Sequence, residues 1–137
     1  MRAIISIALA VLICSCAPTA ARAPAHAPRI ARDSFGVPTI HGRTDAEAAY
    51  GLAIAHAEDD FATIQLVVLA ARGRLGARLG PEGARSDFLY HVLRVDEAVR
   101  DRYARDLTPE TRALIEAYAA GLNAYGAAHP REVLAGA

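Results

Sequence analysis

The sequence predicts an α+β fold that is mostly α-helical, with a short β-hairpin near its N-terminus. Two β-favouring stretches flank the turn-forming residues 33–36, which predicts the hairpin. Apolar residues then recur at spacings of three and four from Ile54 to Leu75, the periodicity of one helix face. Residues 108–110 read Thr-Pro-Glu, which is typical of a second helix start. At 137 residues the chain has room for one small domain at most.

The hairpin is predicted from one stretch around Ile30 and another at Val37–Ile40. Between them, Asp33 favours a turn because its side chain can bond back to the backbone, and Gly36 can adopt positive φ. Pro38 has no amide donor, so the second strand is expected to begin its sheet or to lie at its edge.

A long helical segment is expected next, because Thr44-Asp-Ala-Glu47 is a capping-box pattern. Gly51 and the acidic residues 58–60 make a break possible, so one kinked helix and two consecutive helices fit equally well. The expected apolar stripe consists of Ile54, Ala57, Phe61, Ile64, Val68, Ala71 and Leu75.

The second half of this helix is apolar on nearly all sides, and such a helix must be buried on nearly all sides. The additional apolar residues are Leu66, Val67, Leu69 and Ala70. A hairpin and two modest helices offer little cover for them, which indicates that the chain is part of something larger.

The region between the two main helices is less clearly specified. Glycine and proline between Gly73 and Gly83 predict a loop, and Asp87–Val95 fits a strand or a helix. The last helix is expected to start at Thr108 and to end at His129-Pro130. Its expected buried side consists of Leu114, Tyr118, Gly121, Leu122 and Tyr125.

Residues 1–23 are predicted to be a signal peptide, with Arg2 as the positive region and an apolar core too short to span a bilayer. Cys16 ends a lipobox-like sequence and would then be the lipidated residue of a lipoprotein; the alternative is cleavage after Ala21. Residues 24–28 are predicted to be an extended linker. The expected location is therefore the periplasm or the exterior, with a lipid anchor to a membrane if Cys16 is modified. No cysteine pair remains to form an internal disulfide.

The charge balance argues against a nucleic-acid partner, because the 15 basic residues are matched by 15 acidic ones. The basic cluster Arg72, Arg74 and Arg78 is interpreted as a solvated helix end. The arginine-glycine loop that contains it follows a helix instead of opening one, so it is a poor anion site.

No residue set in the sequence predicts catalysis. A hydrolytic nucleophile needs a base in reach, whereas Ser34 is interpreted as a turn former and Ser86 as a cap. His56 with Asp59 or Asp60 could form half of a metal site or an acid–base pair; the simpler interpretation is a helix surface or a hydrogen-bonded histidine.

The remaining histidines and tyrosines are interpreted as structural. His41 is expected to pack at a strand end, and His91 is expected to be a hydrogen-bonded core histidine. Tyr118 and Tyr125 lie at helical spacing, which favours core positions over a ligand cage.

Four segments in order nevertheless resemble one enzyme family. Arg32-Asp-Ser-Phe-Gly-Val-Pro-Thr-Ile-His resembles the start of the α-chain in penicillin-acylase-type hydrolases, which read Arg-Asp-x-x-Gly-Val/Met-Pro-His-Ile. The resemblance continues through Asp45-Ala-Glu-Ala-Ala-Tyr-Gly-Leu-Ala with His56-Ala-Glu-Asp-Asp, then Gly73-Arg-Leu-Gly-Ala-Arg-Leu-Gly, then Leu107-Thr-Pro-Glu with Ala117-Tyr-Ala-Ala-Gly-Leu-Asn-Ala-Tyr. Together these segments cover nearly everything after the signal peptide.

The resemblance implies an N-terminal-nucleophile hydrolase, a precursor that cuts itself into α- and β-chains and folds as an αββα sandwich. Residues 29–137 would be the N-terminal part of the α-chain, truncated at the C-terminus. The nucleophile would be a serine at the N-terminus of the β-chain, with its own α-amine as base. Substrates would be small-molecule amides, either β-lactam side chains or N-acyl-homoserine lactones. Calcium, found in some members, would bind outside the matched stretch.

The chain departs from the family pattern at several positions. It contains no Gly-Ser junction of the self-cleaving type, so no catalytic residue is expected in it, and no substrate-binding residue is assigned. Thr39 stands where histidine is common, and Glu58 and Asp60 alter an Ala-Gln-Asp-Arg segment. The alternative hypothesis is a non-enzymatic helical lipoprotein module of the periplasm.

Overall fold

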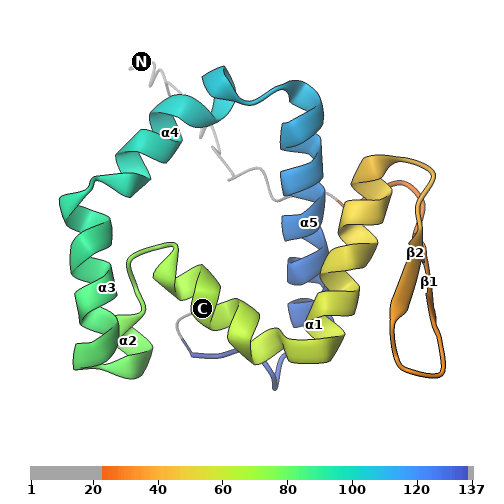
Figure 1. Ribbon diagram of the computed structural model, residues 1–137, viewed down its shortest axis with the longest axis horizontal. Coiled ribbons are helices and arrows are strands. Elements are labelled where there is room, and N and C mark those ends of the chain that lie inside the picture. The colour runs from red at the N-terminus through yellow and green to blue at the C-terminus, as the bar shows by residue number, and fades with distance from the viewer. Residues whose placement is uncertain (1–22, 136–137) are drawn as a thin grey trace, which may run out of the picture.

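The computed structural model describes residues 23–135 and confirms a mostly helical chain with a two-stranded antiparallel hairpin (Figure 1). The elements in order are β1 (Arg29–Arg32), β2 (Pro38–His41), α1 (Asp45–Ala70), α2 (Gly76–Leu79), α3 (Pro81–Val92), α4 (Val95–Asp106) and α5 (Pro109–Ala128). The predicted signal peptide up to residue 22, with its lipidation candidate Cys16, lies outside the described residues. No helix within residues 23–135 is both long enough and apolar enough to cross a membrane.

The hairpin forms where the sequence predicts it. Ile30 pairs with Ile40, and β2 begins at Pro38. The Asp33 carboxylate accepts the amides of Phe35 and Val37, each at 2.9 Å, and Gly36 has a φ of 84°. The turn is therefore stabilised by Asp33 because a carboxylate satisfies two backbone donors that strand pairing leaves free.

The start of α1 is a modified capping box. The Thr44 hydroxyl accepts the amide of Glu47 at 3.2 Å, as predicted. The Glu47 carboxylate accepts the amide of Arg43 at 2.7 Å instead of that of Thr44. Glu47 is buried, and its second oxygen lies 3.6 Å from Nδ1 of His26 in the segment before β1.

Helix α1 is broken at Asp60, which has the non-helical angles φ −159° and ψ 71°. The Asp60 carboxylate accepts the amide of Thr63 at 3.1 Å, so it caps the second half of the helix. Of the two break points suggested by the sequence, the acidic residues 58–60 are correct. Gly51 serves another purpose, because a Cβ there would lie 2.8 Å from both Ile40 and Pro28. Its missing side chain lets the hairpin approach α1.

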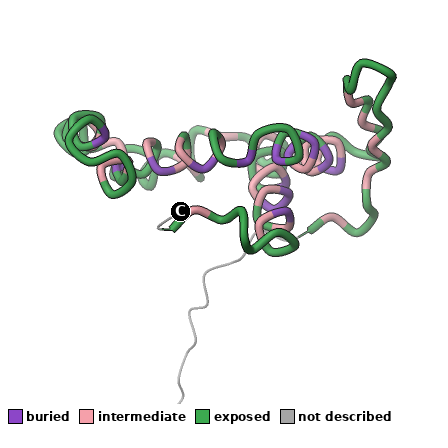
Figure 2. Tube along the Cα trace, turned by 90° about the horizontal axis from the view of Figure 1, so that it is seen from below, coloured by how far each residue is buried: buried purple, intermediate pink, exposed green. Residues whose placement is uncertain are grey.

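The core lies where α1 packs against α5. A Cβ on Gly121 would lie 2.5 Å from the carbonyl oxygen of Tyr50 and 2.7 Å from Cβ of Ala53, so the two backbones are nearly in contact. Phe61 and Tyr125 then meet edge to face, with ring centroids 5.0 Å apart. The buried residues of the two helices are otherwise mostly alanines: Ala53, Ala55, Ala57, Ala117 and Ala120. Figure 2 shows the buried residues concentrated in these two helices.

Two predicted core positions are wrong. Ala71 and Leu114 are exposed. The buried residues of α5 begin at Ala117, so the contact with α1 is confined to the later part of α5, away from Leu114. The apolar spacing was correct, but spacing alone does not say how far along a helix its partner extends.

The region between Gly73 and Val95 differs from its prediction. The predicted loop contains α2 and the start of α3, and the ambiguous stretch from Asp87 is helical. The Asp87 carboxylate accepts the amides of Leu75 at 2.8 Å and Gly76 at 2.7 Å, which joins α3 to α2. Gly80, with a φ of 64°, separates the two helices. Ser86, predicted to be a cap, lies inside α3.

The backbone of the segment after α5 is bound by the side chain of Gln65. Buried Gln65 donates its amide to the carbonyl oxygen of Glu132 at 3.0 Å and accepts the amide of Leu134 at 2.7 Å. Its carboxamide thus satisfies one donor and one acceptor of the returning chain, as a strand neighbour would.

Candidate functional site

The serines of the described region are not arranged as nucleophiles. Ser34 lies exposed in the hairpin turn, and Ser86 lies exposed on α3. Among residues 23–135, neither hydroxyl makes a hydrogen bond to a histidine or a carboxylate that could serve as base. The described part of the chain therefore offers no activated hydroxyl.

His56 is bonded to a tyrosine and makes no hydrogen bond to Asp59 or Asp60 among residues 23–135. Nδ1 of exposed His56 lies 3.0 Å from the Tyr118 hydroxyl on α5, while Asp60 binds the backbone of α1. The simpler interpretation of His56, a hydrogen-bonded surface histidine, is the one observed. His91 is exposed and bonds the carbonyl oxygen of Gly73 at 3.2 Å, so its predicted core position is wrong. His41 is exposed instead of packed.

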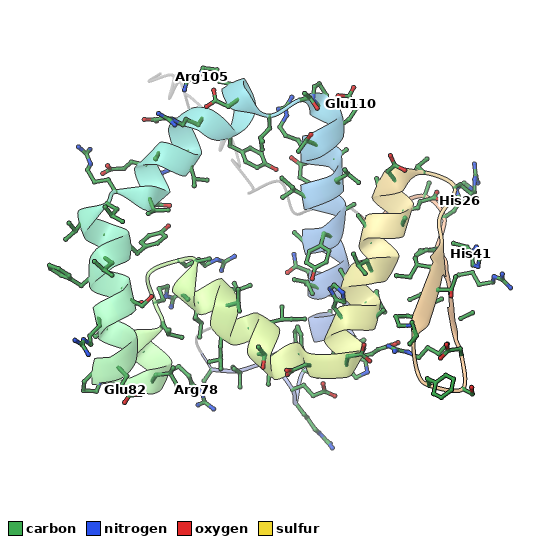
Figure 3. The ribbon with its side chains drawn as sticks, viewed as in Figure 1. His26, His41, Arg78, Glu82, Arg105 and Glu110 are labelled. Atoms are coloured by element: carbon green, nitrogen blue, oxygen red, sulfur yellow. The ribbon has the colours of Figure 1, made fainter. Side chains whose placement is uncertain are left out.

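Several charged side chains lie far apart from one another. Figure 3 shows six titratable side chains spread around the outer rim of the molecule: His26, His41, Arg78, Glu82, Arg105 and Glu110. No three Asp, Glu, His or Cys side chains of residues 23–135 are grouped so as to hold a metal ion.

The most connected polar group is the guanidinium of Arg32. Its Nη1 donates to the carbonyl oxygen of Gly36 at 2.8 Å, and its Nη2 lies 3.2 Å from that of Ala55. The same Nη2 lies 2.9 Å from Oε2 of Glu58 and 3.0 Å from Oδ1 of Asp59. These hydrogen bonds, with that to Glu58 first, hold the pKa of Arg32 above its ordinary value.

A second group surrounds Tyr125 at the end of α5. Its hydroxyl donates to Glu132 at 3.1 Å, and its ring stacks on His129 with centroids 4.1 Å apart. Burial raises the pKa of the Tyr125 phenol, and the neighbouring Glu132 carboxylate raises it further. Tyr125 is a core residue, as predicted, and it remains protonated and donating at neutral pH.

A cleft of about 380 Å³ runs along the second half of α1. Its lining comes from α1, α5 and the segment after α5, and comprises Phe61, Ile64, Gln65, Val68, Arg72, Ala119, Leu122, Asn123, Gly126 and Val133. Val67 on the same helix is 61% exposed. The described residues thus leave the second half of α1 only partly covered, although its sequence is apolar on nearly all sides.

Helices α3 and α4, with Leu93 between them, carry several exposed apolar side chains, which we call the α3–α4 apolar face. It consists of Phe88, Leu89, Val92, Leu93 and Val99, all more than half exposed. Figure 1 shows these helices as an arc away from the α1–α5 pair, and α4 contains no buried residue. A depression of about 450 Å³ continues this face from Leu93 to Ile115 at the start of α5.

One buried donor also lacks a partner. Nε of Arg112 on α5 is buried and makes no hydrogen bond within residues 23–135. Because an unpaired buried donor is unfavourable by about 1–3 kcal/mol, such atoms are normally satisfied in a complete structure.

The comparisons with known proteins place this helical chain in one class. Residues 28–136 match the family model described as penicillin amidase. The chain belongs to the penicillin amidase family.

Named relatives come from two branches. The penicillin acylase 2 proenzyme of Pseudomonas sp. (strain SE83) is 34% identical over 97 residues, which make up 71% of this chain and 12% of that protein. The acyl-homoserine lactone acylase QuiP of Pseudomonas aeruginosa is 31% identical over 96 residues, 70% of this chain and 11% of that protein. The acyl-homoserine lactone acylase PvdQ of Pseudomonas fluorescens (strain Pf0-1) is 29% identical over 104 residues, 70% of this chain and 13% of that protein. The chain thus spans about an eighth of the length of these relatives.

Sequence reasoning missed the residues with the most specific long-range contacts. Gln65 was not singled out, although a polar residue within an apolar helical run is a signal for a buried hydrogen bond. Arg32 was noted only as part of a family motif, and its acidic partners were considered only as neighbours of His56.

Proposed function

We propose that this chain is the N-terminal part of the α-chain of an exported acylase precursor. The complete protein would hydrolyse linear amide bonds of acylated small molecules, with a serine at the N-terminus of a separate β-chain as nucleophile and an αββα sandwich as fold. Membership of the penicillin amidase family supports this proposal, as does the word proenzyme in the name of one relative.

The contribution of the present residues would be scaffold. The observation that carries this assignment is the combination of an uncovered α3–α4 apolar face with the lack of an activated nucleophile among residues 23–135. An apolar surface of this extent is typical of an interface. The buried Nε of Arg112, which has no hydrogen-bond partner among residues 23–135, also fits a surface at which a further segment or an ordered water supplies an acceptor. In the proposed enzyme the β-chain would cover this surface.

The substrate would be either a β-lactam with an amide side chain or an N-acyl-homoserine lactone, since relatives named for both activities match equally long stretches. Any calcium would bind in the remainder of the enzyme. Residues 1–23 would direct export to the periplasm or the exterior, and Cys16 would add a lipid anchor if it is acylated. The rival hypothesis of a non-enzymatic lipoprotein module has no support from the family match.

The test is an amidase assay on residues 24–137 beside the complete gene product. Both would be incubated with a penicillin, a cephalosporin and N-acyl-homoserine lactones of several chain lengths. The proposal predicts hydrolysis of one substrate class by the complete product only. Turnover by residues 24–137 would overturn the scaffold role, and inactivity of the complete product on every amide would overturn the acylase assignment.

A further inference from the structure

We infer that Arg32 is a positioning residue that locks the hairpin onto α1 at the break of that helix. This goes beyond the proposed acylase function and does not depend on it. It gives a physical role to two sequence motifs, Arg32–His41 and residues 56–60, which were identified only by their resemblance to family sequences.

The contacts of Arg32 join three separate pieces of backbone. One end of the guanidinium binds the turn of its own hairpin at Gly36. The other end binds Ala55 in the last turn of α1 before the break, together with the carboxylates of Glu58 and Asp59. A single side chain therefore fixes the hairpin turn relative to a point on α1, Ala55, that lies 23 residues after Arg32 in the sequence.

The chemistry of this group requires arginine. The guanidinium presents five N–H donors in a rigid planar fork, and here its two terminal nitrogens face opposite ways, toward the turn and toward the helix. A lysine ammonium is a single point of charge and lacks the planar fork that binds the turn and the helix through separate nitrogens. The Arg32 side chain is also less exposed, at 29%, than its partners Glu58 at 45% and Asp59 at 55%. The carboxylates therefore reach inward to a group lodged between hairpin and helix.

The three consecutive acidic residues 58–60 have two different roles. Glu58 and Asp59 bind Arg32, whereas Asp60 binds Thr63 and caps the second half of α1. The hairpin is thereby attached at the point where the helix changes direction. An isolated two-stranded hairpin is marginally stable at best, so this attachment, with the close contact at Gly51, is what orders it.

The inference is tested by hydrogen exchange, followed by mass spectrometry, on the complete gene product. Arg32→Ala should speed exchange of peptides from residues 29–41 by at least about fivefold, because the hydrogen bonds that join the turn to α1 are lost. Arg32→Lys should give most of the same increase, because the charge remains while the fork is lost. The control is Arg29→Ala on the same strand, since Arg29 is exposed and makes no side-chain hydrogen bond or ion pair among residues 23–135.

Location distinguishes positioning from general destabilisation. Peptides from residues 117–125 of α5 should exchange as in the wild type, because Arg32 has no contact there. Equal acceleration in hairpin and α5 would overturn the inference, as would wild-type exchange of the hairpin in Arg32→Ala or full rescue by Arg32→Lys. Should Arg32→Ala not yield soluble protein, Arg32→Lys and the double variant Glu58→Gln/Asp59→Asn carry the same prediction. Because the readout is exchange, it does not depend on amide hydrolysis.

Discussion

Helices α1 and α5 approach so closely at Gly121 that adding one methyl group there should separate them. The same addition at Gly126, five residues later on the same helix, should be tolerated. At Gly121 the new Cβ would lie 2.5 Å from a backbone oxygen of Tyr50, which cannot rotate away. At Gly126 the nearest atom is Cζ of Phe61 at 3.3 Å, the end of a side chain that can shift slightly.

The magnitude follows from two terms. Replacing glycine by alanine inside a helix is favourable by about 1 kcal/mol, and this gain is common to both variants. Forcing an extra group into a filled contact is unfavourable by roughly 1–3 kcal/mol, and this term applies to Gly121→Ala. The two variants should therefore differ by about 2 kcal/mol in the free energy of opening the α1–α5 contact, a factor of about 30 in exchange protection.

The assay is hydrogen exchange of α1 and α5 peptides in the complete gene product. Gly121→Ala should lose protection in residues 50–57 and 117–125, whereas Gly126→Ala should keep or gain protection. Equal protection in the two variants would refute the reasoning, because it would mean that the backbones of α1 and α5 are not in contact at Gly121.

Three further predictions concern single side chains. Leu69→Ala removes a side chain that is 1% exposed and should lower the opening free energy of α1 by about 2–5 kcal/mol. The control Val67→Ala, on the exposed side of the helix, should change that free energy by less than about 0.5 kcal/mol. A similar loss in both variants would contradict the burial of Leu69. Gln65→Leu should release residues 132–134, seen as faster proteolysis of the segment after α5, with unchanged cleavage counting against the anchor. Hydrogen bonds from Thr63 lower the pKa of Asp60 below its ordinary 3.8, so its stabilisation of α1 is complete above that value and is lost as the pH falls through the lower folded-state pKa. Asp60→Asn keeps a capping side chain and should abolish this acid dependence in the exchange of residues 61–70, whereas an identical pH profile would contradict the role of the carboxylate.

The parts of the fold that could be predicted are those with local causes. The Asp33 turn, the Thr44 and Thr108 caps and the proline at the start of α5 each involve groups within four residues of one another. Side chains at such spacing can only meet in one way, so their pattern in the sequence predicts the structure directly.

The parts that could not be predicted depend on distant partners. Gln65 binds Glu132 and Leu134 only because α5 brings the chain back to α1. No short-range sequence pattern predicts which residues meet there. Likewise, Asp87 stabilises the turn at Leu75 and Gly76, which allows helices in a glycine-rich stretch that reads locally as a loop. The spacing of apolar residues identified helix faces correctly. It could not predict that Leu114 is exposed, because that depends on how far along α5 the contact with α1 extends.

The same distinction between local and distant partners applies to the candidate site. The interpretation of His56 as a hydrogen-bonded surface histidine is confirmed, whereas the expectation that no residue of this stretch is catalytic stays a prediction. The role of Arg32 could not be predicted from the sequence, because most of its partners lie more than 20 residues away, at residues 55–59. Only the folded contact between hairpin and helix reveals it.

The central claim, that this chain begins a longer acylase precursor, is tested most directly by the polypeptide encoded beyond Ala137. The account predicts that the reading frame continues to a Gly-Ser junction, and that mass spectrometry of the mature protein finds a second chain beginning with that serine. A stop codon directly after Ala137 in the intact gene, with a single mature chain as the product, would contradict it.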